Sequence, residues 1–150
     1  KVTYQDENLL CVAFEDYYSV GNYNNIRVGL RSVVANVKSG EIYDLKDVIS
    51  TNHTFANMWK EEAMDHYPEN GFVNVYDAKE LEHFFEGNSG EERISPIFML
   101  TGEGIEIGFE YVTEDTSVGN GYLTIDFDKE ELSKFQKKPK FWKMVAEEIS

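Results

Sequence analysis

The sequence is nearly devoid of cysteine. Cys11 is the only one in 150 residues, so no intramolecular disulfide can form. It lies in an apolar run from Leu9 to Phe14 and is expected to be a small core residue. The alternative, a reactive thiol, needs a nearby positive charge or base, and the local sequence supplies neither.

Long hydrophobic runs are also missing. No stretch approaches the roughly 20 apolar residues that cross a bilayer, and no secretory signal is visible at the start. Because the chain begins at Lys1 without a methionine, we expect it to be a trimmed or mature piece of a longer parent. A signal peptide or membrane anchor upstream of Lys1 is compatible with that expectation.

Basic residues are scarce relative to acids. Fourteen Lys and Arg stand against 28 Asp and Glu, which gives a net charge of −14. Such a charge repels phosphate backbones and anionic lipids and attracts cationic partners. We therefore do not expect the protein to bind nucleic acid. The competing interpretation is that the acids only keep the domain soluble.

Motifs that carry catalysis or cofactors are absent from the sequence. There is no Gly-x-Ser-x-Gly elbow, phosphate-binding glycine loop or Cys-x-x-Cys pair. His53, His66 and His83 are too far apart to place two imidazoles on one helical face. Calcium binding near Asp126 and Asp128 lacks the expected loop spacing. We therefore predict no cofactor, no metal site and no catalytic residue.

One enzymatic alternative stays open, a hydrolase acting on cell-wall polymer through paired carboxylates. With 28 acids the sequence does not single out a pair. The pairs that can be nominated are Glu61 with Glu62, Glu114 with Asp115, and Asp126 with Asp128.

What the chain does have is apolar and aromatic content. Hydrophobic residues make up 41%, including ten Phe, nine Tyr and two Trp, which is typical of a packed interior. A single domain over residues 1–150 is expected from this length.

Strand-forming segments at about 8–18 and 26–38 flank a turn-forming stretch, which predicts a long antiparallel hairpin. In the second segment the apolar positions change parity: Val28 and Leu30 are followed by Val33, Ala35 and Val37. We expect a β-bulge near residue 32 to reverse the inward face.

Helical spacing follows in two places. Phe55, Met58, Trp59 and Ala63 predict a helix that is capped by Thr51 or Thr54 and ends before Pro68. A second, shorter helix is indicated by the capping box Asp77-x-x-Glu80, with Gly87 at its left-handed C-terminal end.

Alternation with period two returns from Ile97 onward. It predicts a hairpin around residues 102–104, a third strand at 123–127, and a last apolar helical stripe after Pro139. The predicted fold is α+β, a twisted antiparallel β-sheet packed on one face by helices.

Tyrosines and amides concentrate around the first hairpin loop, a composition suited to protein or carbohydrate contact. We expect the loop at residues 17–25 and the connection at 113–120 to form a contact surface, although aromatics beside turns also pack across strands. The predicted ligand-binding residues are Tyr17, Tyr18, Asn22, Tyr23, Asn24, Glu114 and Asp115.

Two ordered motifs carry a family resemblance over about residues 8–132. The first is Ser39-Gly40-Glu41-Ile42-Tyr43-Asp44-Leu45-Lys46-Asp47, preceded by Tyr17-Tyr18-Ser19. The second is Phe98-x-Leu100-Thr101-x-x-Gly104-Ile105-x-Ile107-x-Phe109-x-Tyr111, followed by Gly119. In this order they resemble the DUF3298 / RsiV-like C-terminal domain family.

The resemblance implies a bacterial, extracytoplasmic module of the cell envelope. Members occur in anti-sigma factors that sense lysozyme, beside the catalytic domain of peptidoglycan deacetylases, and in uncharacterised lipoproteins. It implies a non-catalytic binding or sensing domain whose partner is a cationic, lysozyme-like protein or a peptidoglycan-type glycan. A third possibility is a structural domain that self-associates through an exposed apolar patch, and the oligomeric state is left open.

Overall fold

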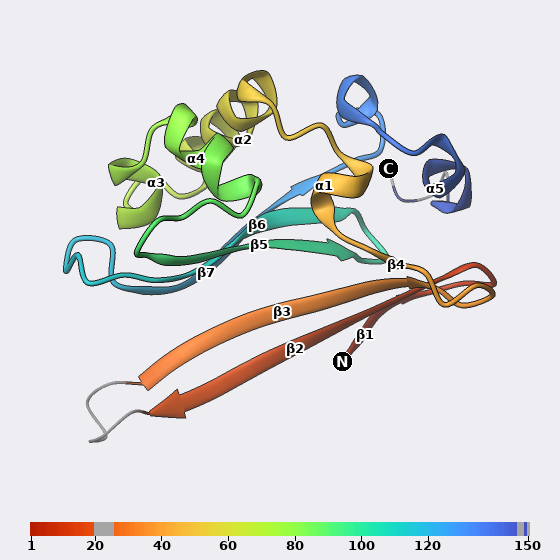
Figure 1. Ribbon diagram of the computed structural model, residues 1–150, viewed down its shortest axis with the longest axis horizontal. Coiled ribbons are helices and arrows are strands. Elements are labelled where there is room, and N and C mark those ends of the chain that lie inside the picture. Colours follow the sequence, from red (N-terminus) through yellow and green to blue (C-terminus); the bar gives the residue numbers. More distant parts are fainter. Residues whose placement is uncertain (20–25, 147–148, 150) are drawn as a thin grey trace.

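The computed structural model describes residues 1–19, 26–146 and 149, and these form three layers (Figure 1). Helices cover one face of a three-stranded sheet, and a four-stranded sheet lies on its other side. The α+β class predicted from the sequence is confirmed, but the strands divide into two antiparallel sheets. The middle sheet is therefore covered on both faces.

The first sheet has the strand order β1-β2-β3-β4, and the second has the order β5-β6-β7. Most of the helical residues fall between β4 and β5, and the C-terminal residues close one end. In chain order the elements are β1 (Val2–Gln5), β2 (Leu9–Ser19), β3 (Ile26–Asn36), β4 (Ile42–Tyr43), α1 (Leu45–Val48), α2 (His53–His66), α3 (Gly71–Val75), α4 (Ala78–Phe85), β5 (Arg93–Leu100), β6 (Ile105–Val112), β7 (Asn120–Phe127), η1 (Ser133–Phe135) and α5 (Pro139–Met144).

The long hairpin of β2 and β3 is confirmed, but the expected bulge near Ser32 is wrong. Pairing runs without a break from Leu9 opposite Asn36 to Ser19 opposite Ile26. Val34 points inward and is buried, whereas Val33 on the other face is partly exposed. Both faces of β3 are apolar here. The change of parity in the apolar positions therefore does not reflect a bulge. The register shift of this sheet lies in β1 instead, between Val2 and Tyr4.

Strand β6 is the centre of the core. Its apolar alternation, from Ile105 to Tyr111, faces the helices. Trp59 of α2 is fully buried and donates a hydrogen bond from Nε1 to the carbonyl of Ile107 at 2.8 Å. Phe85 of α4 lies 4.3 Å from Phe109, ring centre to ring centre. The helices and the sheet are thus joined by aromatic packing and by the hydrogen bond from Trp59.

The helix ends follow local side-chain chemistry. The cap of α2 is Asn52, which accepts the amide of Phe55, and neither predicted threonine takes that role. For α4 the capping box between Asp77 and Glu80 is confirmed, and Gly87 has a positive φ of 86° just beyond the helix. Only glycine takes that backbone conformation at little cost.

Candidate interaction surface

The outer half of the β2–β3 hairpin presents aromatic side chains to solvent. Tyr17 is 68% exposed and Tyr18 is 41% exposed, on opposite faces of β2 near its end. Both are sequence-predicted site residues. Asn22, Tyr23 and Asn24, predicted with them, lie outside the described residues. Exposed tyrosines on a regular strand offer large contact area at small entropic cost.

A carboxylate, Glu15, joins this part of the hairpin to the second sheet. Its Oε1 accepts the hydroxyl of Tyr17 at 2.5 Å and that of Tyr122 on β7 at 3.2 Å. The hydrogen bond to the Glu15 carboxylate and its charge raise the pKa of Tyr17 above its usual value. For Tyr122, burial raises the pKa first, and the bond to Glu15 adds to it. Both phenols therefore stay protonated and donate at neutral pH.

Glu15 also borders an open groove of about 710 Å³ between the two sheets. Leu30 and Met99 supply apolar wall, Glu103 and Glu106 add two more carboxylates, and Lys1 also belongs to the lining. Because three carboxylates outnumber the Lys1 side chain there, the groove suits a partner with an aliphatic stem and a positive end group, such as a lysine or arginine side chain.

The connection between β6 and β7 lies at the same end of the molecule as the outer half of the hairpin (Figure 1). It carries the predicted residues Glu114 and Asp115, and both are exposed. Asp115 accepts the backbone amide and the hydroxyl of Ser117, at 2.8 and 2.6 Å, which lowers its pKa. Asp115 therefore shapes its own loop, while Glu114 faces solvent.

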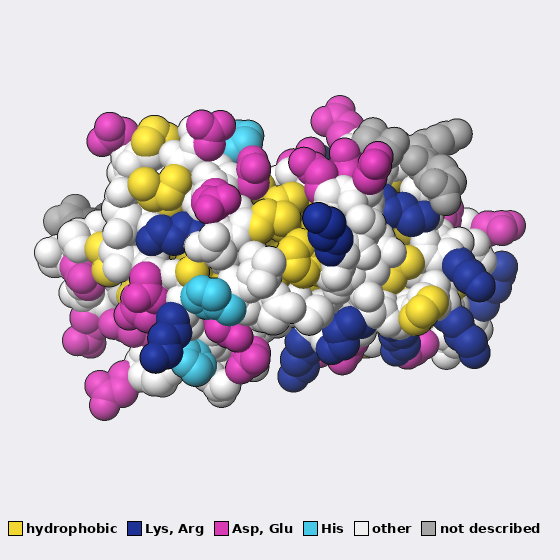
Figure 2. Space-filling view, turned by 90° about the horizontal axis from the view of Figure 1, so that it is seen from above, with side chains coloured by type: hydrophobic (Ala, Val, Ile, Leu, Met, Phe, Trp, Pro, Cys, Tyr) yellow, Lys and Arg dark blue, Asp and Glu magenta, His cyan; other side chains and the backbone are white. Residues whose placement is uncertain are grey.

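Charge is unevenly distributed along the molecule. Six of the 14 basic residues fall between positions 129 and 143, in and before α5. Figure 2, which views the helix-covered face, shows Lys and Arg gathered at this end, while Asp and Glu lie over both halves. The hairpin end lies at the opposite end of the molecule from these bases (Figure 1), so the field guides a cation towards it.

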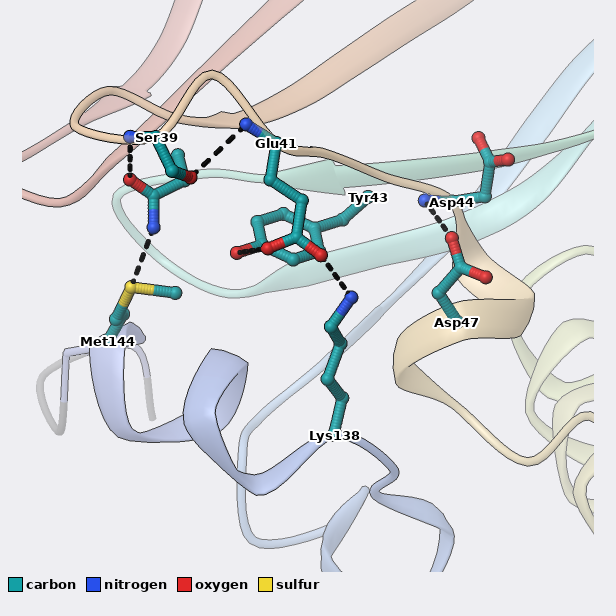
Figure 3. Close-up of polar contacts among 8 residues, drawn as sticks. Ser39, Glu41, Tyr43, Asp44, Asp47, Lys138 and Met144 are labelled. Carbon is teal, nitrogen blue, oxygen red and sulfur yellow. Dashed lines mark hydrogen bonds and ion pairs between the residues drawn. The ribbon is translucent and has the colours of Figure 1, made fainter.

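The Ser39 to Asp47 segment, which carries part of the family resemblance, is used for structure (Figure 3). The Asn36 side chain accepts the amide of Ser39, and the Tyr43 hydroxyl donates to Glu41 at 3.0 Å. Lys138, at the start of α5, forms an ion pair with Glu41 and lies over the Tyr43 ring at 4.9 Å. These groups satisfy one another and fix the turn to the C-terminal residues.

Another group of carboxylates lies on the strand pair β6–β7. Glu106 and Asp126 are direct cross-strand neighbours, and Glu106 accepts the hydroxyl of Thr124 at 2.7 Å. They line a cavity of about 240 Å³ with His66 and Tyr67. Burial, followed by repulsion from Glu106 and Glu103, raises the pKa of Asp126. Asp128, its predicted partner, instead donates its backbone amide to the Glu131 carboxylate and accepts the Glu131 amide at its own carboxylate.

The remaining candidates, Cys11 and His53, contact neighbouring residues of the chain. Cys11 is fully buried and its Sγ accepts the amide of Leu100 at 3.4 Å, while burial raises the pKa of its thiol. His53 faces Glu82 at 3.5 Å. Over residues 1–19, 26–146 and 149, no group of three or more His, Cys, Asp or Glu side chains is placed to hold a metal ion. None of the helices in these ranges has the length and apolar character needed to span a membrane.

No family model matches the chain, and no curated protein matches it either. The resemblance to the DUF3298 / RsiV-like family therefore stays a prediction from the order of its motifs.

Proposed function

We propose that this chain is a non-catalytic recognition domain that binds its partner with the hairpin end. The carrying observation is the arrangement of Tyr17 and Tyr18: they are exposed on a strand that Glu15 ties to Tyr122 of the second sheet. Because the strand is already held in place, its aromatic side chains lose little conformational entropy when a partner binds.

The partner class follows from charge. The net charge of −14 and the carboxylates of Glu15, Glu114 and Asp115 at the hairpin end favour a basic protein, and steering speeds its association at low salt. The family resemblance adds a location, the bacterial cell envelope, and a model partner, a lysozyme-like protein. Peptidoglycan-type glycan is the other ligand, because exposed tyrosines stack on sugar rings.

The test is a titration of the folded chain against hen lysozyme and against purified peptidoglycan, at low and at physiological salt. We expect saturable binding to one of them, and binding to lysozyme should weaken as salt rises. Absence of saturable binding to both at low salt would contradict the proposal.

Matched variants locate the surface. Tyr17→Ala and Tyr18→Ala should each weaken binding about tenfold or more, in the range of aromatic hot spots. Met64→Ala is the control, because Met64 is 37% exposed, close to the value for Tyr18, but lies on α2. Equal affinity in all three variants and the wild type would place the surface elsewhere.

A cell-wall hydrolase is the second candidate. The specific observation is Asp126, whose raised pKa and neighbour Glu106 match the unequal carboxylates that glycoside hydrolysis needs. Release of reducing sugar from peptidoglycan, lost in Asp126→Asn and kept in Asp128→Asn, would favour it. No release by the wild-type chain removes it.

A further inference from the structure

The outer face of the four-stranded sheet is apolar and open. Alternate residues of its strands lie on the face opposite to that of the buried Cys11 and Val34, and paired residues share a row. These residues, here called the outer patch, are Val2, Gln5, Leu10, Val12, Phe14, Arg31, Val33, Ala35 and Ile42.

The exposure of the outer patch is large for apolar side chains. Val2 is 53%, Phe14 51% and Ile42 62% exposed. The helices lie on the far side of the other sheet, so they do not cover this face (Figure 1). An apolar surface that spans four strands indicates an interface rather than scattered exposed residues.

The charge distribution indicates which molecule can cover the outer patch. None of the 28 acids belongs to the outer patch, and its single charged member is Arg31, whose side chain is 73% exposed although its Nε lies 3.9 Å from Oε2 of Glu110 in the second sheet. The next row beyond the patch pairs Asp16 with Gly29, and the Glu110 carboxylate lies near Gly29, because a Cβ there would be 3.2 Å from its Oε1. Two chains of net charge −14 repel each other over most of their surfaces. Within the rows of the outer patch they can meet without placing one carboxylate against another, whereas the Asp16 row would bring acids together.

The register makes the outer patch complementary to itself. Phe14 is paired with Arg31, Val12 with Val33, and Leu10 with Ala35. A twofold axis parallel to the strands, midway between β2 and β3, places each β2 residue over the β3 residue of the same row in a second copy. Phe14 then faces the guanidinium of Arg31 from the other copy, a cation–π pair that occurs twice.

The same axis brings the edge strands together. It lays β1 of one copy over β4 of the other, so that Gln5, which shares the row of Leu10 and Ala35, approaches Ile42. We propose that the outer patch is the interface of a symmetric dimer with this axis. Two sheets packed face to face in this way keep their strands within about 30° of each other.

Sedimentation velocity over a concentration series tests the dimer. We expect reversible dimerisation that Val33→Glu weakens more than tenfold, because it places two carboxylates at the centre of the interface. Val75→Glu is the control, since Val75 is 44% exposed at the end of α3. A wild-type chain that stays monomeric at about 100 µM overturns the proposal.

Two substitutions of Phe14 test the axis itself. Phe14→Glu and Phe14→Lys both remove the ring, but the first sets a negative charge opposite Arg31 of the other copy and the second a positive charge. We therefore expect Phe14→Glu to dimerise more tightly than Phe14→Lys, although net charge alone predicts the reverse. Circular dichroism and thermal melting establish that both fold, and the reverse order of affinities overturns the axis.

Discussion

Glu41 and Lys138, which are 97 positions apart, form an ion pair that fastens the turn before β4 to the start of α5. Lys138 is the only described non-glycine residue with a positive φ, at 58°. Its side chain thus holds a contact while its backbone takes a conformation that suits glycine better.

These two roles of Lys138 can be separated by substitution. Lys138→Ala loses the ion pair and keeps the unfavourable backbone, whereas Lys138→Gly loses the pair and relieves the backbone. We expect the alanine variant to be the less stable of the two in urea unfolding. If the glycine variant is less stable than the alanine variant, the backbone is not strained.

The same pair gives a pH dependence with a definite sign. The hydrogen bond from Lys138, with that from Tyr43, lowers the pKa of Glu41 below its usual 4.5 in the folded chain. The contribution of Glu41 to stability is therefore present above pH 4.5 and is lost as pH falls through the folded value. We expect Glu41→Gln to be less stable than wild type at pH 7 and the gap to narrow below about pH 4.

Asp126 should behave in the opposite way. Burial and the neighbouring acids raise its folded pKa above 3.8, so the folded state prefers the protonated form. Stability from this group is present below pH 3.8 and is lost as pH rises through the folded value. Asp126→Asn should therefore stabilise the chain at pH 7, more at low salt, and the gain should vanish at low pH. Thermal melting at several pH values measures it.

The buried tryptophans provide a stability prediction. Trp59→Phe removes the hydrogen bond to Ile107 and leaves a cavity, and we expect a loss of about 2–4 kcal/mol. Trp142→Phe removes a similar bond, to Val48 at 2.9 Å, and is the matched comparison. Urea unfolding measures both. A loss below about 1 kcal/mol for Trp59→Phe would show that the helix layer does not depend on this contact.

Local patterns predicted most of the elements, because strands and caps are set by neighbours in sequence. The capping box of Asp77 and Glu80 and the β2–β3 hairpin were identified in this way. The failure at residues 33–37 has a physical cause, since alternation assumes that the solvent face is polar. Val33 and Ile42 break that rule on the outer patch.

The candidate site was only partly predictable. Tyr17 and Tyr18 were predicted from composition, and the structure leaves both exposed, but their contact role stays a proposal. Glu15 was missed, because its partner Tyr122 is 107 positions away. Contacts across such a separation depend on how the two sheets pack, and no local pattern encodes that.

Gly71 links the helices to the acidic loop of the proposed surface. A Cβ at this position would collide with the carbonyl oxygen of Ser117, in the connection that carries Glu114 and Asp115. We expect Gly71→Ala to cost about 1–3 kcal/mol, as overpacking does, and to move this loop. Amide chemical shifts of residues 113–119 should change while those of β1 stay constant. Gly87→Ala is the contrast: its Cβ would meet no atom within 4 Å, so it should strain only its own backbone and leave the loop in place.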